Sequence, residues 1–260
     1  MHHSKDLIQL TVPSAARHVL ADVKEGITSV LGENLIGLYL YGSCITGDFD
    51  DNVSDVDLLT VINDDLSEDK VAVLASRHDA IARGHPQWDD RVEVVYISRR
   101  GLAGFRDRPS PAAVISPGEP FHAIEAGDDW LITWYPVRVN SVPLIGPPAD
   151  EVIPPISRDE YVESVRKHIQ SFSGRVSGTP PLASLAYAIL TMCRGLYTVE
   201  HGEQVSKLKA AGWAERRLPE WSGLIRNALL WRRSNDNTAA PPAVADQARR
   251  FVQKAGEMAR

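Results

Sequence analysis

The spacing of apolar residues predicts alternating helices and strands in the first hundred residues. Apolar positions recur at helical spacing in residues 14–31 and 67–84, with Ser67 placed as an N-cap and Gly84 as a stop signal. Three shorter runs are almost continuously apolar, as buried strands are, and cover residues 35–41, 55–62 and 91–98. This order of helix, strand, strand, helix and strand predicts a small mixed α/β sheet.

The pattern changes further along the chain. Residues 100–120 are rich in Gly and Pro and are expected to be irregular, whereas residues 128–146 fit either a helix or a strand. The proline-rich residues 146–160 mark a domain boundary. Apolar residues at helical spacing then predict helices over residues 158–172, 182–200, 204–214, 219–232 and 242–258. We therefore expect an α/β domain over residues 1–150 and an all-α helical bundle over residues 151–260.

Composition narrows the partners that this chain could have. The net charge is −6, whereas proteins that bind long nucleic acids usually present a basic face. We see no apolar run of about 20 residues and no secretory signal at the N-terminus, so we expect no membrane partner. Cys44 and Cys193 are far apart and have no metal-like spacing, which fits a protein of the reducing cytoplasm rather than a disulfide framework. We also expect the protein to be a monomer.

The richest chemistry lies in the stretch LYLYGSCITGDFDDNVSDVDLLTVI, residues 38–62. Gly42 and Ser43 follow a predicted strand, and backbone N–H groups at such a turn bind phosphate. Asp55 and Asp57 are two residues apart, so on a strand their carboxylates share one face. Two carboxylates that close together repel each other unless a cation lies between them, and Mg²⁺ prefers such oxygen ligands together with substrate phosphates.

Glu93 is a third acid with apolar neighbours, since it lies between Val92 and Val94 of the predicted strand 91–98. It is a candidate for a third metal ligand or for a general base that deprotonates a hydroxyl nucleophile. Together with the Gly-Ser turn, the acids predict a Mg²⁺-dependent phosphate site.

These residues carry a resemblance to a known superfamily. Gly42-Ser43, Gly47 and Ser54-Asp55-Val56-Asp57 resemble the signature of the DNA polymerase β-type nucleotidyltransferases. The chain is more closely similar to one branch, the aminoglycoside 3″- and 9-adenylyltransferases of the spectinomycin and streptomycin resistance type. The segments that carry this likeness are residues 38–62, VEVVYI, LIGPPADEV and LTMCRGLYTVEHGEQVSKLKAAGWAERRLPE.

The resemblance implies a role for each matching residue. Gly42 and Ser43 would hold the phosphates of ATP, and Asp55 and Asp57 would ligate Mg²⁺. Glu93 would be the catalytic base. Two cations of the helical region, Arg194 and Lys207, would reach the triphosphate. The implied reaction transfers AMP from ATP to a hydroxyl group of a small-molecule acceptor and releases pyrophosphate.

The chain departs from this family where the family binds its drug. The family uses a tryptophan in a GEW motif and acids just before the arginine-bearing helix, but this chain has SPGEPF, with Pro120, and SGTPPLASLAY. Six residues between positions 119 and 134, here called the variable region, could form a cation site instead. The more ordinary interpretation is that the tryptophans pack in the protein and that the acids lie in solvated loops. The six residues are Glu119, Glu125, Asp128, Asp129, Trp130 and Trp134.

Two alternatives to an aminoglycoside adenylyltransferase remain open from the sequence. The enzyme could transfer the nucleotide to a protein side chain or a tRNA end. The chain could also be a nucleotide-binding regulator without activity, although a protein that only binds nucleotides has no need of Glu93 as a base.

Overall fold

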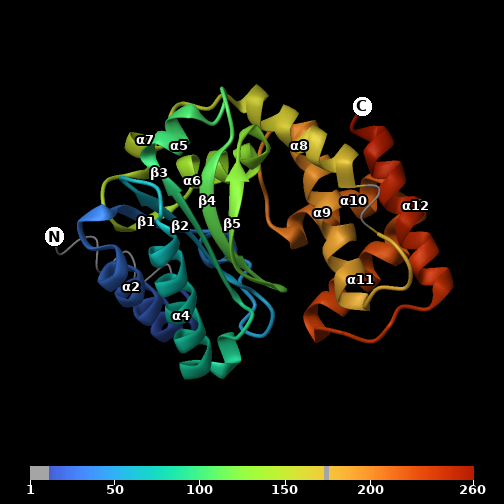
Figure 1. The fold of residues 1–260 in the computed structure, drawn as a ribbon. Helices are drawn as coiled ribbons and strands as arrows, with labels where there is room; N and C mark the ends of the chain where they lie inside the picture. The colour runs from blue at the N-terminus through green and yellow to red at the C-terminus, as the bar shows by residue number, and fades with distance from the viewer. Residues whose placement is uncertain (1–11, 173–175) are drawn as a thin grey trace. The chain divides into compact units, whose positions relative to one another are not determined.

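The computed structural model describes residues 12–172 and 176–260, so the N-terminal segment searched for a secretory signal lies outside the described residues. The chain divides into two compact units, one ending at Pro155 and the other beginning at Ile156 (Figure 1). The first unit is built on a sheet, and the second is helical. An α/β region followed by an all-α region is the fold class that the sequence predicts, and it is confirmed.

A six-stranded mixed sheet forms the centre of the first unit, with strand order β5-β4-β3-β2-β1-β6. Strands β2 and β3 are parallel, and the other neighbouring pairs are antiparallel. The three strands predicted from continuous apolar runs are present as β1, β2 and β3. The strands are β1 (Leu35–Tyr41), β2 (Val56–Ile62), β3 (Val92–Ser98), β4 (Ser110–Ser116), β5 (Glu119–Ala126) and β6 (Val142–Ile145).

Helices cover the sheet on both faces. Helices α2 (Arg17–Leu31) and α4 (Glu68–Gly84) lie side by side on one face (Figure 1) and bury a single apolar cluster with the even-numbered residues of β1, β2 and β3. The opposite face carries the odd-numbered residues and is contacted by α5 (Arg99–Gly104) and α6 (Leu131–Val139). Both faces of these strands are therefore covered over most of their length, and the odd-numbered face is the one that carries Asp57 and Glu93.

Residues 100–120 correct the sequence analysis, because they are not irregular. They contain all of α5 except its first residue, all of β4 and the start of β5. Their Gly and Pro residues have local roles: Gly118 has φ +81° in the β4–β5 turn, and Pro120 lies on β5, an edge strand that tolerates a missing N–H. The ambiguous residues 128–146 contain η4 (Asp128–Trp130), α6 and β6.

Short elements complete the first unit. They are η1 (Ser14–Ala16), η2 (Gly32–Asn34), α3 (Ser43–Thr46), η3 (Pro86–Trp88) and α7 (Ala149–Val152).

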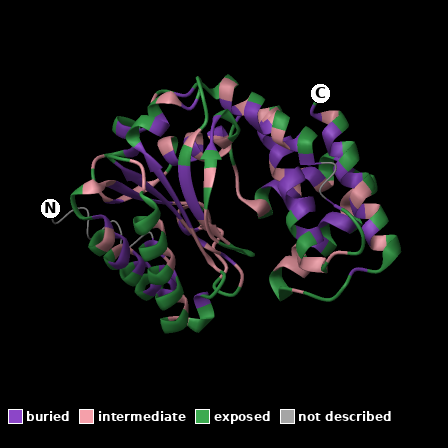
Figure 2. Ribbon diagram, in the orientation of Figure 1, coloured by how far each residue is buried: buried purple, intermediate pink, exposed green. Residues whose placement is uncertain are grey.

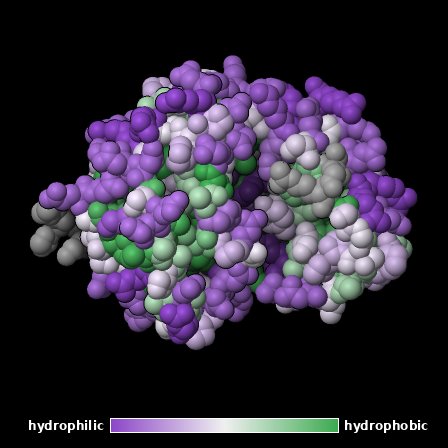
Figure 3. All heavy atoms as spheres, viewed as in Figure 1, coloured by the Kyte–Doolittle hydropathy of each residue, from purple (hydrophilic) through white to green (hydrophobic). Residues whose placement is uncertain are grey.

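The second unit packs its helices around α9, which contacts α8, α10, α11 and α12. Figure 2 shows α9 as mostly buried, and hydrophilic residues predominate on the face drawn in Figure 3. Contrary to our reading of the sequence, α9 is long and apolar enough to cross a membrane, but 67% of its apolar window is buried inside the fold, as in a core helix. The helices are α8 (Arg158–Phe172), α9 (Leu182–His201), α10 (Lys207–Arg217), η5 (Pro219–Trp221), α11 (Ser222–Ser234) and α12 (Pro242–Met258).

One buried histidine makes the stability of the first unit dependent on pH. His78 of α4 is 5% exposed, and its Nε2 lies 2.7 Å from the Tyr96 hydroxyl of β3. Burial lowers the pKa of His78 from 6.5 to about 4, although the nearby Asp79 opposes this shift. Between these two values the unfolded chain binds a proton that the folded chain does not, so stability is lost as the pH falls.

We expect His78 to remove about 3 kcal/mol from the free energy of unfolding as the pH falls from 6.5 to 4. Urea unfolding at several pH values measures this loss. In the His78→Gln variant the loss should be smaller by that amount, whereas His18→Gln, at an exposed position on α2, should behave like the unsubstituted protein. Equal pH dependence in all three proteins would contradict this assignment.

Candidate active site

Three polar side chains lie in one row at one end of the neighbouring strands β1, β2 and β3. Tyr41 of β1 is the register partner of Asp57 of β2, which in turn is the partner of Glu93 of β3. Register partners on adjacent strands point to the same face. The hydroxyl of Tyr41 donates a hydrogen bond to Oε1 of Glu93, at 3.2 Å. The fold thus brings together Asp57 and Glu93, which are far apart in the sequence.

The Gly42-Ser43 turn lies directly against this row. Gly42 follows β1 with φ +67°, and Ile45 and Thr46 donate their backbone N–H groups to its carbonyl oxygen, both at 3.2 Å. The turn therefore opens a short helix, α3. A Cβ atom at Gly42 would lie 2.0 Å from Oδ2 of Asp57, so only glycine lets the carboxylate approach the turn this closely.

Asp55 lies just ahead of β2 rather than on it, because the strand begins at Val56. The segment before β2 is held in place by Arg91, whose Nε donates to the carbonyl oxygen of Ser54 at 3.1 Å. The backbone N–H of Val56 donates to the carbonyl oxygen of Arg91 at 2.9 Å. These contacts hold the loop that carries Asp55 in place at the start of β2.

The region around the turn is electrically negative. Burial raises the pKa of Tyr41 well above 10, and the charges of Glu93 and Asp57 add to the increase. The pKa of Cys44 is raised to about 12 by burial first and then by Asp57 and Asp55. Cys44 therefore stays protonated at neutral pH and, being buried, is a packing residue rather than a reactive thiol.

The acids fit a hard cation by their chemistry. Asp55, Asp57 and Glu93 supply the oxygen atoms that Mg²⁺ prefers, and the missing side chain of Gly42 lets Oδ2 of Asp57 lie directly against the Gly42-Ser43 turn. Within residues 12–172 and 176–260, however, no three His, Cys, Asp or Glu side chains are grouped so that they could hold a metal ion by themselves. Mg²⁺ commonly takes its remaining ligands from substrate phosphates, so the metal role of these acids stays a prediction.

The two predicted triphosphate ligands belong to the second unit. Arg194 lies half-buried on α9, and Lys207 is the first residue of α10, after the N-cap Ser206. The Nζ atom of Lys207 lies 5.6 Å from the ring centroid of Tyr187 on α9. The contact of these two cations with ATP stays a prediction, whereas Gly42, Ser43, Asp57 and Glu93 are assembled within the first unit.

The sequence did not predict two residues of the site, Tyr41 and Arg91. Tyr41 is hydrogen-bonded to Glu93, and Arg91 holds the carbonyl group of Ser54, the residue before Asp55. Tyr41 is an odd-numbered residue of β1, but the sequence does not give the pairing of β1 with β2. Without that pairing, Tyr41 could not be assigned to the same face as the acids. Arg91 gave no signal, because an arginine at the start of a strand is ordinary.

The variable region supports the plainer interpretation of its residues. Trp134 is fully buried and stacks on Trp130 with ring centroids 5.5 Å apart, as expected of a packing pair. Four acids of the region are exposed, namely Glu119, Glu125, Asp128 and Asp129.

Comparison with known proteins agrees with the geometry of the site. Residues 24–102 match the nucleotidyltransferase domain family, and residues 151–257 match the family described as the aminoglycoside adenylyltransferase C-terminal domain. The chain thus combines a nucleotidyltransferase domain with a domain of the aminoglycoside adenylyltransferase C-terminal type. It is therefore an adenylyltransferase, and the resemblance stated from the sequence is confirmed.

Relatives of this adenylyltransferase match over most of its length. The spectinomycin 9-adenylyltransferase of Staphylococcus aureus is 27% identical over 226 residues, which cover 83% of this chain and 82% of the relative. An aminoglycoside (3″)(9) adenylyltransferase of Shigella flexneri is 24% identical, with 77% of this chain and 81% of the relative covered.

A solved structure shows the same fold. The spectinomycin adenyltransferase of Enterococcus faecialis, solved with ATP and spectinomycin, superposes with a TM-score of 0.74 at 18% identity, covering 93% of this chain and 99% of that one.

Proposed function

We propose that this adenylyltransferase transfers AMP from ATP to a hydroxyl group of an aminoglycoside-type antibiotic, with Mg²⁺ as cofactor and pyrophosphate as product. One observation carries the proposal: the Gly42 turn, Asp57 and Glu93 meet on one face of three neighbouring strands. This arrangement supports a site in which the turn would bind phosphate, Asp57 would ligate the metal ion and Glu93 would act as the base. The relatives named above are enzymes for spectinomycin and aminoglycosides.

Each residue has a distinct task in the proposed reaction. The backbone N–H groups around Ser43 bind the phosphates of ATP, and Arg194 and Lys207 bind the triphosphate from the second unit. Glu93 accepts the proton of the acceptor hydroxyl, whose oxygen then attacks the α-phosphorus while pyrophosphate leaves. Tyr41 holds the carboxylate of Glu93 through their hydrogen bond and so orients it for this transfer.

Asp55 and Asp57, with Glu93 as a possible third ligand, are the residues that would hold Mg²⁺. When bound, the ion neutralises the charge of the triphosphate. Without a counter-charge the acids would repel the phosphates; burial first, and then the charges of Glu93 and Asp57, raise the pKa of Tyr41 beside them. The proposed enzyme acts as a monomer in the cytoplasm, where both buried cysteines stay free.

The acceptor is best identified by a panel of labelled reactions. Purified enzyme with α-labelled ATP and Mg²⁺ should label spectinomycin or streptomycin, and cells that express it should gain resistance to the labelled drug. Glu93→Gln in the same assays is the matched control and should give neither label nor resistance.

Two results would contradict this acceptor assignment. Label on protein or RNA, with none on any drug, would favour the alternative acceptors left open by the sequence. Tight binding of ATP and Mg²⁺ without pyrophosphate release from any acceptor would favour a regulator.

A further inference from the structure

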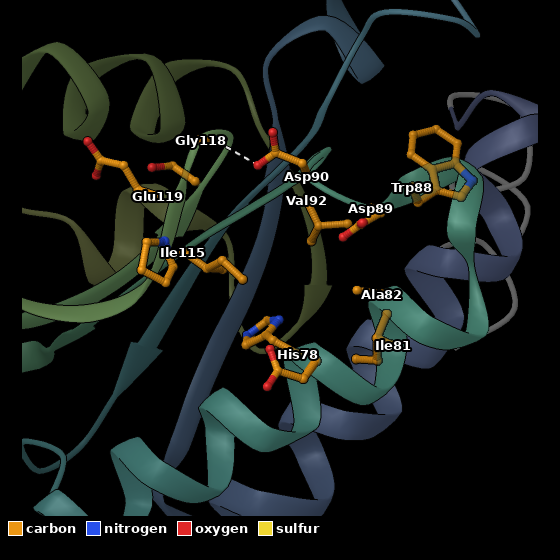
Figure 4. Close-up of a pocket in the computed structure, with 13 residues that line it drawn as sticks. His78, Ile81, Ala82, Trp88, Asp89, Asp90, Val92, Ile115, Gly118 and Glu119 are labelled. Atoms are coloured by element: carbon orange, nitrogen blue, oxygen red, sulfur yellow. Dashed lines mark hydrogen bonds between the residues drawn. The ribbon is translucent and has the colours of Figure 1, made fainter.

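A second cavity lies on the other face of the sheet from the acids of the active site. It has a volume of about 360 Å³ and opens between α4, η3, the start of β3 and the β4–β5 turn (Figure 4). Val92 lines this cavity, whereas the next residue, Glu93, lies beside Asp57 in the candidate active site. The two side chains point to opposite faces because consecutive residues of a strand do so. Pockets for small molecules start at about 300 Å³, so this cavity is large enough for one.

The lining combines apolar walls with charges of one sign. Part of the wall is apolar, from Ile81, Ala82, Trp88, Val92 and Ile115. The charged residues among the lining are all acids, namely Asp79, Asp89, Asp90 and Glu119, and each is exposed at the protein surface. A pocket of this kind attracts a ligand that joins an apolar body to a positive charge.

Two of the four acids are already engaged. Oδ1 of Asp90 accepts a hydrogen bond from the backbone N–H of Gly118, at 2.5 Å, and this contact joins the segment between η3 and β3 to the β4–β5 turn (Figure 4). Asp90 has φ +57°, an uncommon conformation for a residue other than glycine. A carboxylate oxygen of Glu119 lies 3.7 Å from His122. Asp79 and Asp89 therefore remain the best placed to meet a cation at the mouth.

His78 adds a polar group to the cavity wall. Its ring is 5% exposed and lines the cavity, with Nε2 bonded to the Tyr96 hydroxyl. Among the residues that the structure describes, none hydrogen-bonds to Nδ1 of His78. Because burial keeps the ring neutral, Nε2–H can donate to the oxygen of Tyr96 and leave the lone pair of Nδ1 for the N–H of a ligand. The cavity thus has an acceptor in its wall and carboxylates at its mouth.

We propose that this cavity binds a small organic amine, with its apolar body against Ile81, Trp88 and Ile115 and its ammonium group between His78 and the carboxylates of Asp79 and Asp89. The cavity lies on the other face of the sheet from Asp57 and Glu93 and does not depend on the proposed reaction, although its lining includes Pro120, which stands where the resembling family has its drug-binding tryptophan. Glu93 and Val92 are adjacent in the chain, so an occupant would lie beside the strand that carries the catalytic base.

The probe for this site is 2-phenylethylamine, with phenylacetate as a ligand of similar size and opposite charge. In an NMR titration of the full ¹⁵N-labelled chain, the amine should shift the amide signals of residues 88–92 and Gly118 and the indole signal of Trp88. Phenylacetate should leave these signals in place. Signals of Ser43 and Asp57 report the catalytic site in the same spectra, so binding there is distinguished from binding in the cavity.

Matched variants separate the cavity from general charge effects. The double variant Asp79→Asn/Asp89→Asn should weaken binding of the amine by about five- to thirty-fold. Asp69→Asn, which removes an exposed acid of α4 outside the lining, should leave the affinity unchanged. Ala82→Phe should block the cavity and abolish the shifts. Absent shifts with the amine, equal shifts with phenylacetate, or unchanged affinity in the double variant would overturn the proposal.

Discussion

Glu93→Gln is expected to lower kcat for AMP transfer by about 10²- to 10⁴-fold, the contribution usual for a general base. Glutamine has nearly the same shape, and its side-chain oxygen can still accept the hydrogen bond from Tyr41. The substitution therefore removes the proton acceptor and leaves the row of β1, β2 and β3 intact. Pyrophosphate release at saturating ATP and acceptor measures the loss.

The same variant distinguishes the two roles considered for Glu93. If Glu93 acts as a base alone, the variant should bind ATP with Mg²⁺ as the unsubstituted enzyme does. If Glu93 also ligates the ion, the Mg²⁺ concentration needed for half-maximal ATP binding should rise. Tyr41→Phe is the control, because it removes only the hydrogen bond to Glu93 and should cost about two- to ten-fold in kcat. A normal kcat in Glu93→Gln would remove Glu93 from the catalytic residues.

The sequence predicted the central strands and the helical unit well, for a physical reason. Strands β1, β2 and β3 are covered on both faces, so they are almost continuously apolar, and their few acids stand out. The pairing of these strands was not predictable. A shift of one residue in register would turn Glu93 away from Asp57, and register depends on contacts between distant segments.

The β4–β5 hairpin shows the opposite case. Both strands lie at one side of the sheet and β5 is its edge, so their alternation of apolar and polar residues is weak. Gly118 and Pro120 were interpreted as signs of an irregular segment, but they belong to the turn and to the edge strand. The second cavity was missed for the same reason, since its lining comes from α4, η3, β3 and this hairpin.

Gly42→Ala is expected to lower activity by about 10²-fold or more and to reduce the free energy of unfolding by about 1–3 kcal/mol. At φ +67° a residue with a Cβ atom is strained, and that atom would lie 2.0 Å from Oδ2 of Asp57. The carboxylate must then rotate away from the turn, which separates the proposed metal ligand from the phosphate-binding turn. Urea unfolding and pyrophosphate release measure the two effects.

Gly47→Ala is the matched control for this argument. Gly47 also has a positive φ, +83°, but a Cβ atom there would meet nothing within 4 Å. Its substitution should therefore cost about 1 kcal/mol of stability from backbone strain and leave kcat close to that of the unsubstituted enzyme. If both variants lose activity equally, strain in the loop is the cause. If only Gly42→Ala loses it, the position of the Asp57 carboxylate beside the turn is what the reaction requires.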